Sequence, residues 1–313
     1  RRIGARAARA ARGTAPPVGV VTDRRLRAAN VHVAAIALQG QVTAPRYVKG
    51  VAQQVIVPVA DLCAAANGPR DRQLLLGEQV CVFDTQDGWS FVQVDKDGYV
   101  GYLNADQLGA VQTSSHWISA AATHLYPRAD FKVKEAARLS LGATVAVTTT
   151  VDRFSQTPFG WIPTAHLSPV SSRPADPVAV AEHLLGTPYL WGGNSRDGID
   201  CSGLVQLACW ICGFDCPADS DLQAASLGVE MDSDAQVRRG DLLFWHGHVA
   251  FAVDRDTLLH ANSGHMATVY EPLEIAVDRI AAQGDGEITL RRRLSQSKNS
   301  SINHMITTEK TDE

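Results

Sequence analysis

One cysteine stands in a setting that could make it a nucleophile. Cys201 follows a glycine-containing segment, residues 187–193, and precedes an apolar run, residues 204–211, that is long enough for a helix. The first N–H groups of a helix and its dipole lower the pKa of a cysteine placed there. Asp200 and Ser202 are residue types that cap helices and make polar contacts. The sequence therefore predicts an ionised Cys201 at a helix start, with both neighbours close to the reacting group.

A cysteine nucleophile needs a base within hydrogen-bond reach, and that base needs a third group to orient it. His248 opens an alternating segment, and His260 lies in the next apolar segment. Residues 254–256 between them are typical of a three-residue hairpin loop. This register places His260 one diagonal step from His248 on the same face of the sheet. Asn262 falls opposite His248, so both His260 and Asn262 are candidates to bind Nδ1 of the base.

Two kinds of pattern surround these residues. From about residue 51 to 170, short β-branched runs are broken by Gly, Asp and Asn, which indicates strands. Residues 74–80 are echoed by residues 139–145, and copies of about 60 residues predict two small β-barrels. Beyond residue 177 helical patterns come first and strands follow, which favours an α+β domain.

The composition excludes several classes of protein. A net charge of −4 argues against nucleic acid as the main partner. The sequence also contains no run of about 20 apolar residues, so we expect no membrane partner. Cysteines are too sparse for a disulfide scaffold and fit a reducing compartment. We see no export signal and expect a cytoplasmic protein, or an exported one if the true N-terminus is missing. The sequence does not indicate an oligomeric state.

No metal or other cofactor is predicted. Cys209, Cys212 and Cys216 have a spacing that suggests metal ligands, but the first two fall inside the predicted helix and lack a fourth ligand nearby. We expect all three to pack in the core.

Five separated motifs together resemble a known family. They are residues 189–193, 200–205, 239–242 and 247–249, and His260, and they occur in family order. They are similar to the NlpC-type papain-like cysteine peptidases of bacterial cell-wall metabolism, over about residues 176–292. Paired SH3-like domains ahead of such a domain resemble the recycling γ-D-glutamyl-L-diamino-acid endopeptidases. The resemblance implies an α+β fold, a papain-like cysteine peptidase domain preceded by two small SH3-like β-barrels.

The domain boundaries follow from these patterns. We expect a disordered basic tail at 1–27, a first SH3-like domain with an N-terminal extension at 28–112, and a second at 113–170. A linker at 171–177 leads to the peptidase domain at 178–294, and a disordered tail occupies 295–313.

The resemblance also implies a reaction and the residues that perform it. The substrate would be a murein-derived peptide with a free N-terminal L-Ala, cleaved at its γ-D-Glu–diamino acid bond. A carboxylate is needed to bind the substrate ammonium, and Asp200, Asp219 or Glu78 could supply it. The implied catalytic set is Cys201 as nucleophile, His248 as base and His260 as orienting residue, and the implied substrate contacts are Tyr189, Asp200, Ser202, Asp219, Ser220, Glu78 and Tyr99.

Two other functions fit the same residues. The protein could be a non-catalytic module that binds cell wall through its SH3-like domains. The catalytic residues also occur in papain-like amidases and acyl transferases, because they do not fix which acyl group is transferred.

Overall fold

The computed structural model describes residues 23–232 and 234–295. The predicted tails at 1–22 and 296–313 lie outside the described residues. Residues 23–27, which we expected to be disordered, instead form an ordered turn. The reason is ionic: Arg24 binds Asp71, and Arg25 binds Asp219.

The first β-rich unit is a single antiparallel sheet built mainly around leucine and valine side chains. Its strand order is β5-β4-β8-β7-β6-β3-β9, and its core includes Leu62, Leu74 and Leu103. An N-terminal extension packs through Val33 and Ala35 on Phe91 of this sheet. The extension contains β1 (Ala34–Ala35), a 3-10 turn (Ile36–Leu38) and β2 (Tyr47–Val48); the sheet contains β3 (Val51–Val55), β4 (Val59–Cys63), β5 (Arg70–Leu75), β6 (Gln79–Gln86), β7 (Trp89–Val94), β8 (Val100–Asn104) and β9 (Leu108–Gly109).

The second β-rich unit repeats the first in a shorter form. In both copies the last long strand, β8 or β16, passes through a 3-10 turn into a short closing strand. Both also have a glycine with φ of 86° at the equivalent turn, Gly77 and Gly142, a conformation that residues with a side chain rarely adopt. The second unit contains β10 (His116–Ile118), β11 (Ala122–Leu125), β12 (Ala137–Ser140), β13 (Thr144–Val145), β14 (Thr149–Val151), β15 (Phe154–Thr157), β16 (Gly160–Pro163) and β17 (Leu167–Pro169).

These two units lie where the sequence predicts two SH3-like β-barrels, and we call them the first and second SH3-like units. Strand pairing in the described residues does not close either of them into a complete ring. The first is an open seven-stranded sheet, and the second consists of three small sheets. The two units meet at their equivalent turns, where Thr144 N–H donates to the carbonyl of Leu76 at 2.9 Å.

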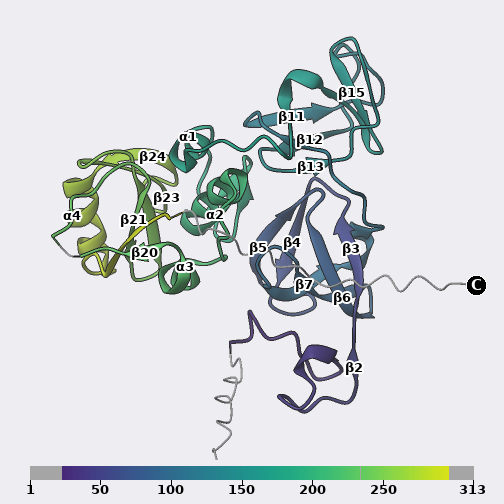
Figure 1. Ribbon diagram of the computed structural model, residues 1–313, viewed down its shortest axis with the longest axis horizontal. Helices are drawn as coiled ribbons and strands as arrows, with labels where there is room; N and C mark the ends of the chain where they lie inside the picture. The colour runs from purple at the N-terminus through teal and green to yellow at the C-terminus, as the bar shows by residue number, and fades with distance from the viewer. Residues whose placement is uncertain (1–22, 233, 296–313) are drawn as a thin grey trace, which may run out of the picture.

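The third unit is an α+β domain with a papain-like arrangement. Its sheet has the order β20-β25-β21-β22-β23-β24. Figure 1 shows α2 between this sheet and the first SH3-like unit, with α4 on the far side. The elements are α1 (Pro177–Glu182), β18 (Asn194–Ser195), β19 (Gly198–Ile199), α2 (Cys201–Cys212), α3 (Ser220–Ser226), β20 (Val229–Glu230), β21 (Asp241–Trp245), β22 (His248–Ala252), β23 (Thr257–Asn262), β24 (Ala267–Pro272), α4 (Leu273–Gln283) and β25 (Leu290–Arg293).

Alternation along the central strands explains why helices cover both faces of this sheet. Leu242 and Phe244 pack with α1 and α2, whereas Leu243 and Trp245 pack with α4. Side chains of successive strand residues point to opposite faces, so each strand supplies both layers. The sheet is therefore buried on both sides, and α2 is fixed between it and the SH3-like units.

Candidate active site

Cys201 is the first residue of α2, and Asp200 is the N-cap of that helix. One carboxylate oxygen of Asp200 accepts hydrogen bonds from the N–H of Gly203 at 2.7 Å and the hydroxyl of Ser202 at 3.0 Å. The other accepts from the N–H of Gly192 at 2.8 Å. Asp200 thus starts the helix and ties the preceding glycine turn to it, which fixes where the sulfur lies.

The thiol of Cys201 is more deeply buried than its position at a helix start suggests. Cys201 as a whole is only 5% exposed to solvent. Burial, followed by the negative charge of Asp200, raises the pKa of the Cys201 thiol to about 12. Backbone N–H groups of Val249, Ser202 and Cys201 itself act in the opposite direction but are outweighed. The predicted ionised sulfur is therefore wrong for the protein without substrate: desolvation exceeds the effect of the helix terminus.

His248 lies at the start of β22, on the tight turn that leads from β21. The turn residues are His246 and Gly247, and Gly247 has φ of 72°. The Cys201 thiol lies 3.9 Å from the carbonyl of Gly247, so the sulfur sits against the residue next to the predicted base. The ring of Trp245 packs on that of His248, with centroids 5.7 Å apart. A helix start and a hairpin turn thus bring Cys201 and His248 together from distant parts of the chain.

A chain of hydrogen bonds holds the His248 ring. Its Nε2 lies 2.9 Å from Nδ1 of His260, and Nε2 of His260 lies 2.8 Å from the carboxylate of Glu271. Arg279 binds both oxygens of Glu271, at 2.9 and 2.7 Å. Two of these residues, Glu271 on β24 and Arg279 on α4, are not part of the sequence prediction.

The protons in this series of hydrogen bonds can be assigned by starting from the carboxylate of Glu271. Burial alone would raise the pKa of Glu271, but hydrogen bonds from Arg279 and His260 hold it far below its usual value. An ionised carboxylate only accepts hydrogen bonds, so His260 Nε2 carries a proton and its Nδ1 accepts from His248 Nε2–H. The lone pair of His248 is then on Nδ1. The orienting contact is therefore at Nε2, not at Nδ1 as we expected.

Both imidazoles are neutral in this arrangement. Burial, with a smaller contribution from His260, lowers the pKa of His248 to about 3. Burial likewise lowers the pKa of His260, although Glu271 opposes the change. In the protein without substrate, Cys201 is therefore a neutral thiol and His248 a neutral imidazole. The lowered pKa of His248 also makes it a weaker base than a free imidazole.

The predicted hairpin register is confirmed, and it decides between the two orienting candidates. Phe251 pairs with Leu259, as a three-residue loop requires, and this brings His260 to His248. The side-chain oxygen of Asn262 instead accepts from the backbone N–H of His265 at 2.9 Å. Asn262 closes its own turn, and His260 is the residue against the base.

Most of the predicted substrate contacts lie near Cys201. Cys201 and Asp200 both contribute to a raised pKa of the Tyr189 hydroxyl, of which burial is the main cause. A cavity of about 10 Å³ is lined by Asp200, Ser202 and Asp219. Ser220 follows as the first residue of α3.

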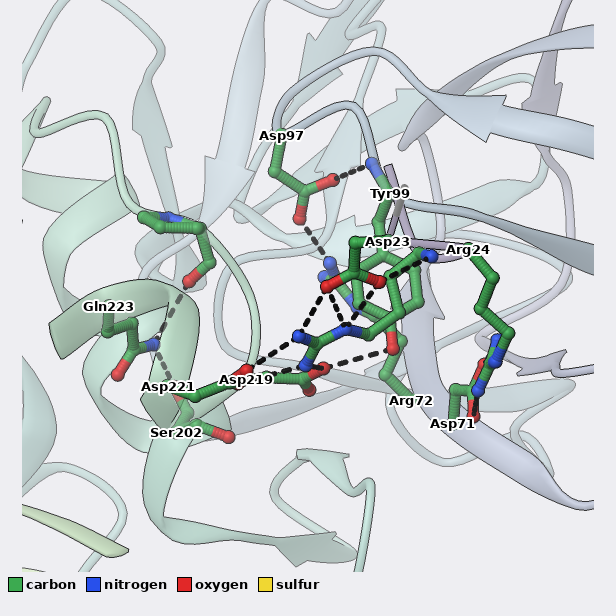
Figure 2. A network of polar contacts seen from close by, with 12 residues as sticks. Asp23, Arg24, Asp71, Arg72, Asp97, Tyr99, Ser202, Asp219, Asp221 and Gln223 are labelled. Atoms are coloured by element: carbon green, nitrogen blue, oxygen red, sulfur yellow. Dashed lines mark hydrogen bonds and ion pairs between the residues drawn. The ribbon is translucent and has the colours of Figure 1, made fainter. Parts of the chain in front are cut away.

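Asp219 connects the peptidase domain to the first SH3-like unit. Its carboxylate accepts from the hydroxyl of Tyr99 at 3.1 Å, and Figure 2 shows the two side chains converging. Asp219 has φ of 56° and ψ of 137°, a conformation that costs a residue with a side chain free energy and that recurs at binding sites. Gln223 fixes this loop to α2 by donating to the carbonyl of Ser202 at 2.9 Å. The structure thus places Tyr99 and Asp219 together beside the helix that carries Cys201.

Glu78 does not join this site. Its carboxylate binds Lys96 at 2.7 Å and lines a separate cavity of about 350 Å³ with Leu207 and Trp210. Leu207 lies roughly 9 Å along α2 from Cys201, at 1.5 Å per residue. The predicted substrate contact by Glu78 is not supported by its position, because the turn that carries it faces the second SH3-like unit.

The cysteine side chains are unpaired and mostly buried. All six cysteines are free thiols, and Cys209, Cys212 and Cys216 are buried in the core as expected. Within residues 23–232 and 234–295, no group of three potential metal ligands comes together. In that same part of the chain, no helix has the length and apolar character needed to cross a membrane.

Comparisons with known proteins agree with this geometry. Residues 186–277 match the NlpC/P60 family, and residues 62–108 match the bacterial dipeptidyl-peptidase Sh3 domain. The chain is 31% identical over 214 residues to a γ-D-glutamyl-L-lysine dipeptidyl-peptidase of Bacillus subtilis, covering 60% of this chain and 71% of that protein. It is 38% identical over 87 residues to dipeptidyl-peptidase 6 of Lysinibacillus sphaericus, covering 28% and 32% of the two chains.

A solved structure extends the similarity to the arrangement of domains. The crystal structure of an NlpC/P60 family protein from Bacillus cereus covers 78% of this chain and 99% of its own, with a TM-score of 0.65 and 20% identity. At that identity the likeness concerns the fold alone. Together with the Bacillus subtilis relative, it shows that the chain belongs to the NlpC/P60 family, whose peptidases are cysteine peptidases.

Proposed function

We propose that the protein is a cysteine endopeptidase that hydrolyses the γ-D-glutamyl–diamino acid bond of short murein peptides with a free N-terminal L-Ala. The observation that carries this proposal is the position of Asp219. Its carboxylate lines one small cavity with Asp200 and Ser202, the residues on either side of the nucleophile, and it accepts a hydrogen bond from the Tyr99 hydroxyl of the first SH3-like unit at 3.1 Å. A carboxylate beside the start of the helix that carries the nucleophile suits a substrate whose ammonium group lies only two residues from the scissile bond.

The relatives support the choice of bond. One is named a γ-D-glutamyl-L-lysine dipeptidyl-peptidase. A dipeptidyl-peptidase must bind the free amino end of its substrate so that the bond after the second residue lies at the nucleophile. The carboxylate of Asp219 positions the substrate in this way by binding its ammonium group. The SH3-like unit matters because it supplies Tyr99 and so closes the cleft at the ammonium end.

The chemistry begins from the neutral pair. His248 Nδ1 removes the proton of Cys201 as the sulfur attacks the γ-carbonyl carbon, so proton transfer and attack are coupled. The backbone N–H groups of Cys201 and Ser202, at the start of α2, lie where they can stabilise the developing oxyanion. A donor of this kind contributes about 3 kcal/mol in related reactions.

Breakdown of this adduct releases the diamino acid. The protonated His248 donates its proton to the leaving nitrogen, and the C–N bond breaks to leave an acyl group on Cys201. His248 then removes a proton from water, which attacks the thioester and returns the thiol. His260 and Glu271 keep the imidazole in the required tautomer through both steps.

The test uses two peptides, L-Ala-γ-D-Glu-L-Lys and its N-acetylated form, each also made with diaminopimelate in place of lysine. We expect release of L-Ala-γ-D-Glu from the free-amine peptides, with kcat/KM at least about tenfold lower for the acetylated forms because a charge-assisted contact is lost. The Cys201→Ala variant serves as control and should release nothing. Equal cleavage of free and acetylated peptides would remove the role proposed for Asp219.

A further inference from the structure

The N-terminal segment places a cation on the carboxylate proposed to bind substrate. The guanidinium of Arg25 donates to Asp219 at 2.7 Å and to both oxygens of Asp221, at 2.9 and 2.6 Å. It also binds Asp23 within its own turn. Figure 2 shows these three carboxylates gathered at one point, with Tyr99 beside them. Arg25 side-chain exposure is only 20%, so the contact is enclosed.

A bidentate ion pair and a backbone hydrogen bond also hold this segment, residues 23–27, on the first SH3-like unit. Arg24 forms a bidentate pair with Asp71 of β5, with both distances 2.8 Å. The carbonyl of Arg25 accepts from the N–H of Val100 at 2.6 Å, next to Tyr99. The segment therefore bridges the first SH3-like unit and the peptidase domain, the two walls of the proposed ammonium site.

The Arg25 contact and the substrate contact use the same atoms. Oδ2 of Asp219 accepts from both Arg25 and Tyr99, and a substrate ammonium would need that oxygen too. A guanidinium held in the chain has a high effective concentration at this site, so it competes without having to diffuse there.

We propose that residues 23–27 form an autoinhibitory strap in which Arg25 occupies the ammonium subsite at Asp219. This inference rests on the function proposed above. Substrates with a free amino end bind only when Arg25 leaves Asp219, so their affinity is reduced by the fraction of molecules in which the strap is open. Removing Arg25 should increase affinity for the free-amine peptide and leave the acetylated peptide unaffected.

The experiment measures binding and turnover separately. Calorimetry in the Cys201→Ala protein compares L-Ala-γ-D-Glu-L-Lys with its N-acetylated form, with and without Arg25→Ala. We expect Arg25→Ala to tighten binding of the free-amine peptide by about tenfold. Arg24→Ala, which loosens the strap but keeps Arg25, should give a smaller gain. Arg46 lies on the N-terminal extension and forms an ion pair with Asp84 of β6. Arg46→Ala serves as the matched control and should leave the affinity for both peptides unchanged.

Each outcome bears on one of the two proposals. Equal or weaker binding of the free-amine peptide by a folded Arg25→Ala protein would overturn the strap, as would equal gains for both peptides. If Arg25→Ala tightens binding but the protein with an intact Cys201 does not cleave the peptide, the proposed reaction fails while the strap stands. Absence of binding by every form would overturn both.

Discussion

His248 depends on three residues from neighbouring elements of the fold. Its Nε2 is bound by His260, and His260 is bound by Glu271, which Arg279 holds through both carboxylate oxygens. The arrangement fixes one tautomer and leaves Nδ1 of His248 as the base. Glu271 is therefore a positioning residue, and its charge decides which nitrogen carries the proton.

Replacing Glu271 with glutamine tests that role. In Glu271→Gln the amide can donate as well as accept, so the tautomers of His260 and His248 are no longer fixed. We expect kcat/KM to fall by about 100-fold, the scale of a general base, mainly through kcat, with a changed pH profile. Glu274→Gln, an exposed glutamate at the start of helix α4, is the matched control. An unchanged kcat with an unchanged pH profile would contradict the assignment.

Cys201 should react as a neutral thiol in the protein without substrate. Its pKa is raised to about 12, so the thiolate fraction is small at neutral pH and rises about tenfold for each pH unit below that value. Alkylation of Cys201 by iodoacetamide, followed by peptide mapping to separate it from the other thiols, should therefore accelerate steadily from pH 6 to pH 9. A fast rate that is constant below pH 7 would show an ionised sulfur and contradict the burial argument.

At the scale of elements, helix α2 and the β22–β23 hairpin position the site. The helix begins at Cys201 because Asp200 caps it, and both features can be read from the sequence. The hairpin register could be predicted because a three-residue loop allows only one pairing of the flanking strands. Glu271 was missed because it belongs to β24, whose pairing with β23 depends on a longer connection. The signal that could have found it is a single acid in an alternating segment, placed diagonally from His260.

The cap of α2 should matter more for activity than for stability. Asp200→Ala removes the acceptor of Gly203 N–H and Gly192 N–H, and should cost about 1–2 kcal/mol of unfolding free energy. Asp176 caps α1 through Val178 N–H at 3.0 Å, so Asp176→Ala should cost a similar amount. Urea unfolding and kcat/KM measured together should show activity lost only in Asp200→Ala. Equal activity loss in both variants would mean that the cap acts only through stability.

At the scale of the whole molecule, a buried polar cluster joins the first SH3-like unit to the peptidase domain. Arg72 binds Asp97, and its guanidinium also donates to Gln206 of α2 at 2.7 Å. Gln206 in turn donates to Asp97 at 2.8 Å. The sequence could not predict this cluster, because three polar residues far apart in the chain carry no pattern that links them. The strap was missed for the same reason: its arginines resemble a solvated tail until Asp71, Asp219 and Asp221 lie beside them.

Breaking this cluster should destabilise the protein strongly. Asp97→Asn leaves the buried Arg72 charge without its partner, which should cost about 3–5 kcal/mol. Asp130→Asn, which removes a solvent-screened surface pair with Arg128, should have a far smaller effect. Urea unfolding of both variants checks the difference. Similar small losses would show that the domain contact depends on apolar packing alone.

During the proposed reaction, Cys201 forms a thioester with the γ-carbonyl group of the substrate. Rapid acid quenching of the enzyme with L-Ala-γ-D-Glu-L-Lys, followed by mass spectrometry of its peptides, tests this most directly. We expect the L-Ala-γ-D-Glu group to be attached to the peptide that contains Cys201, transiently and in amounts that rise with substrate. Product formation with no adduct at Cys201, or with full activity in Cys201→Ala, would contradict it.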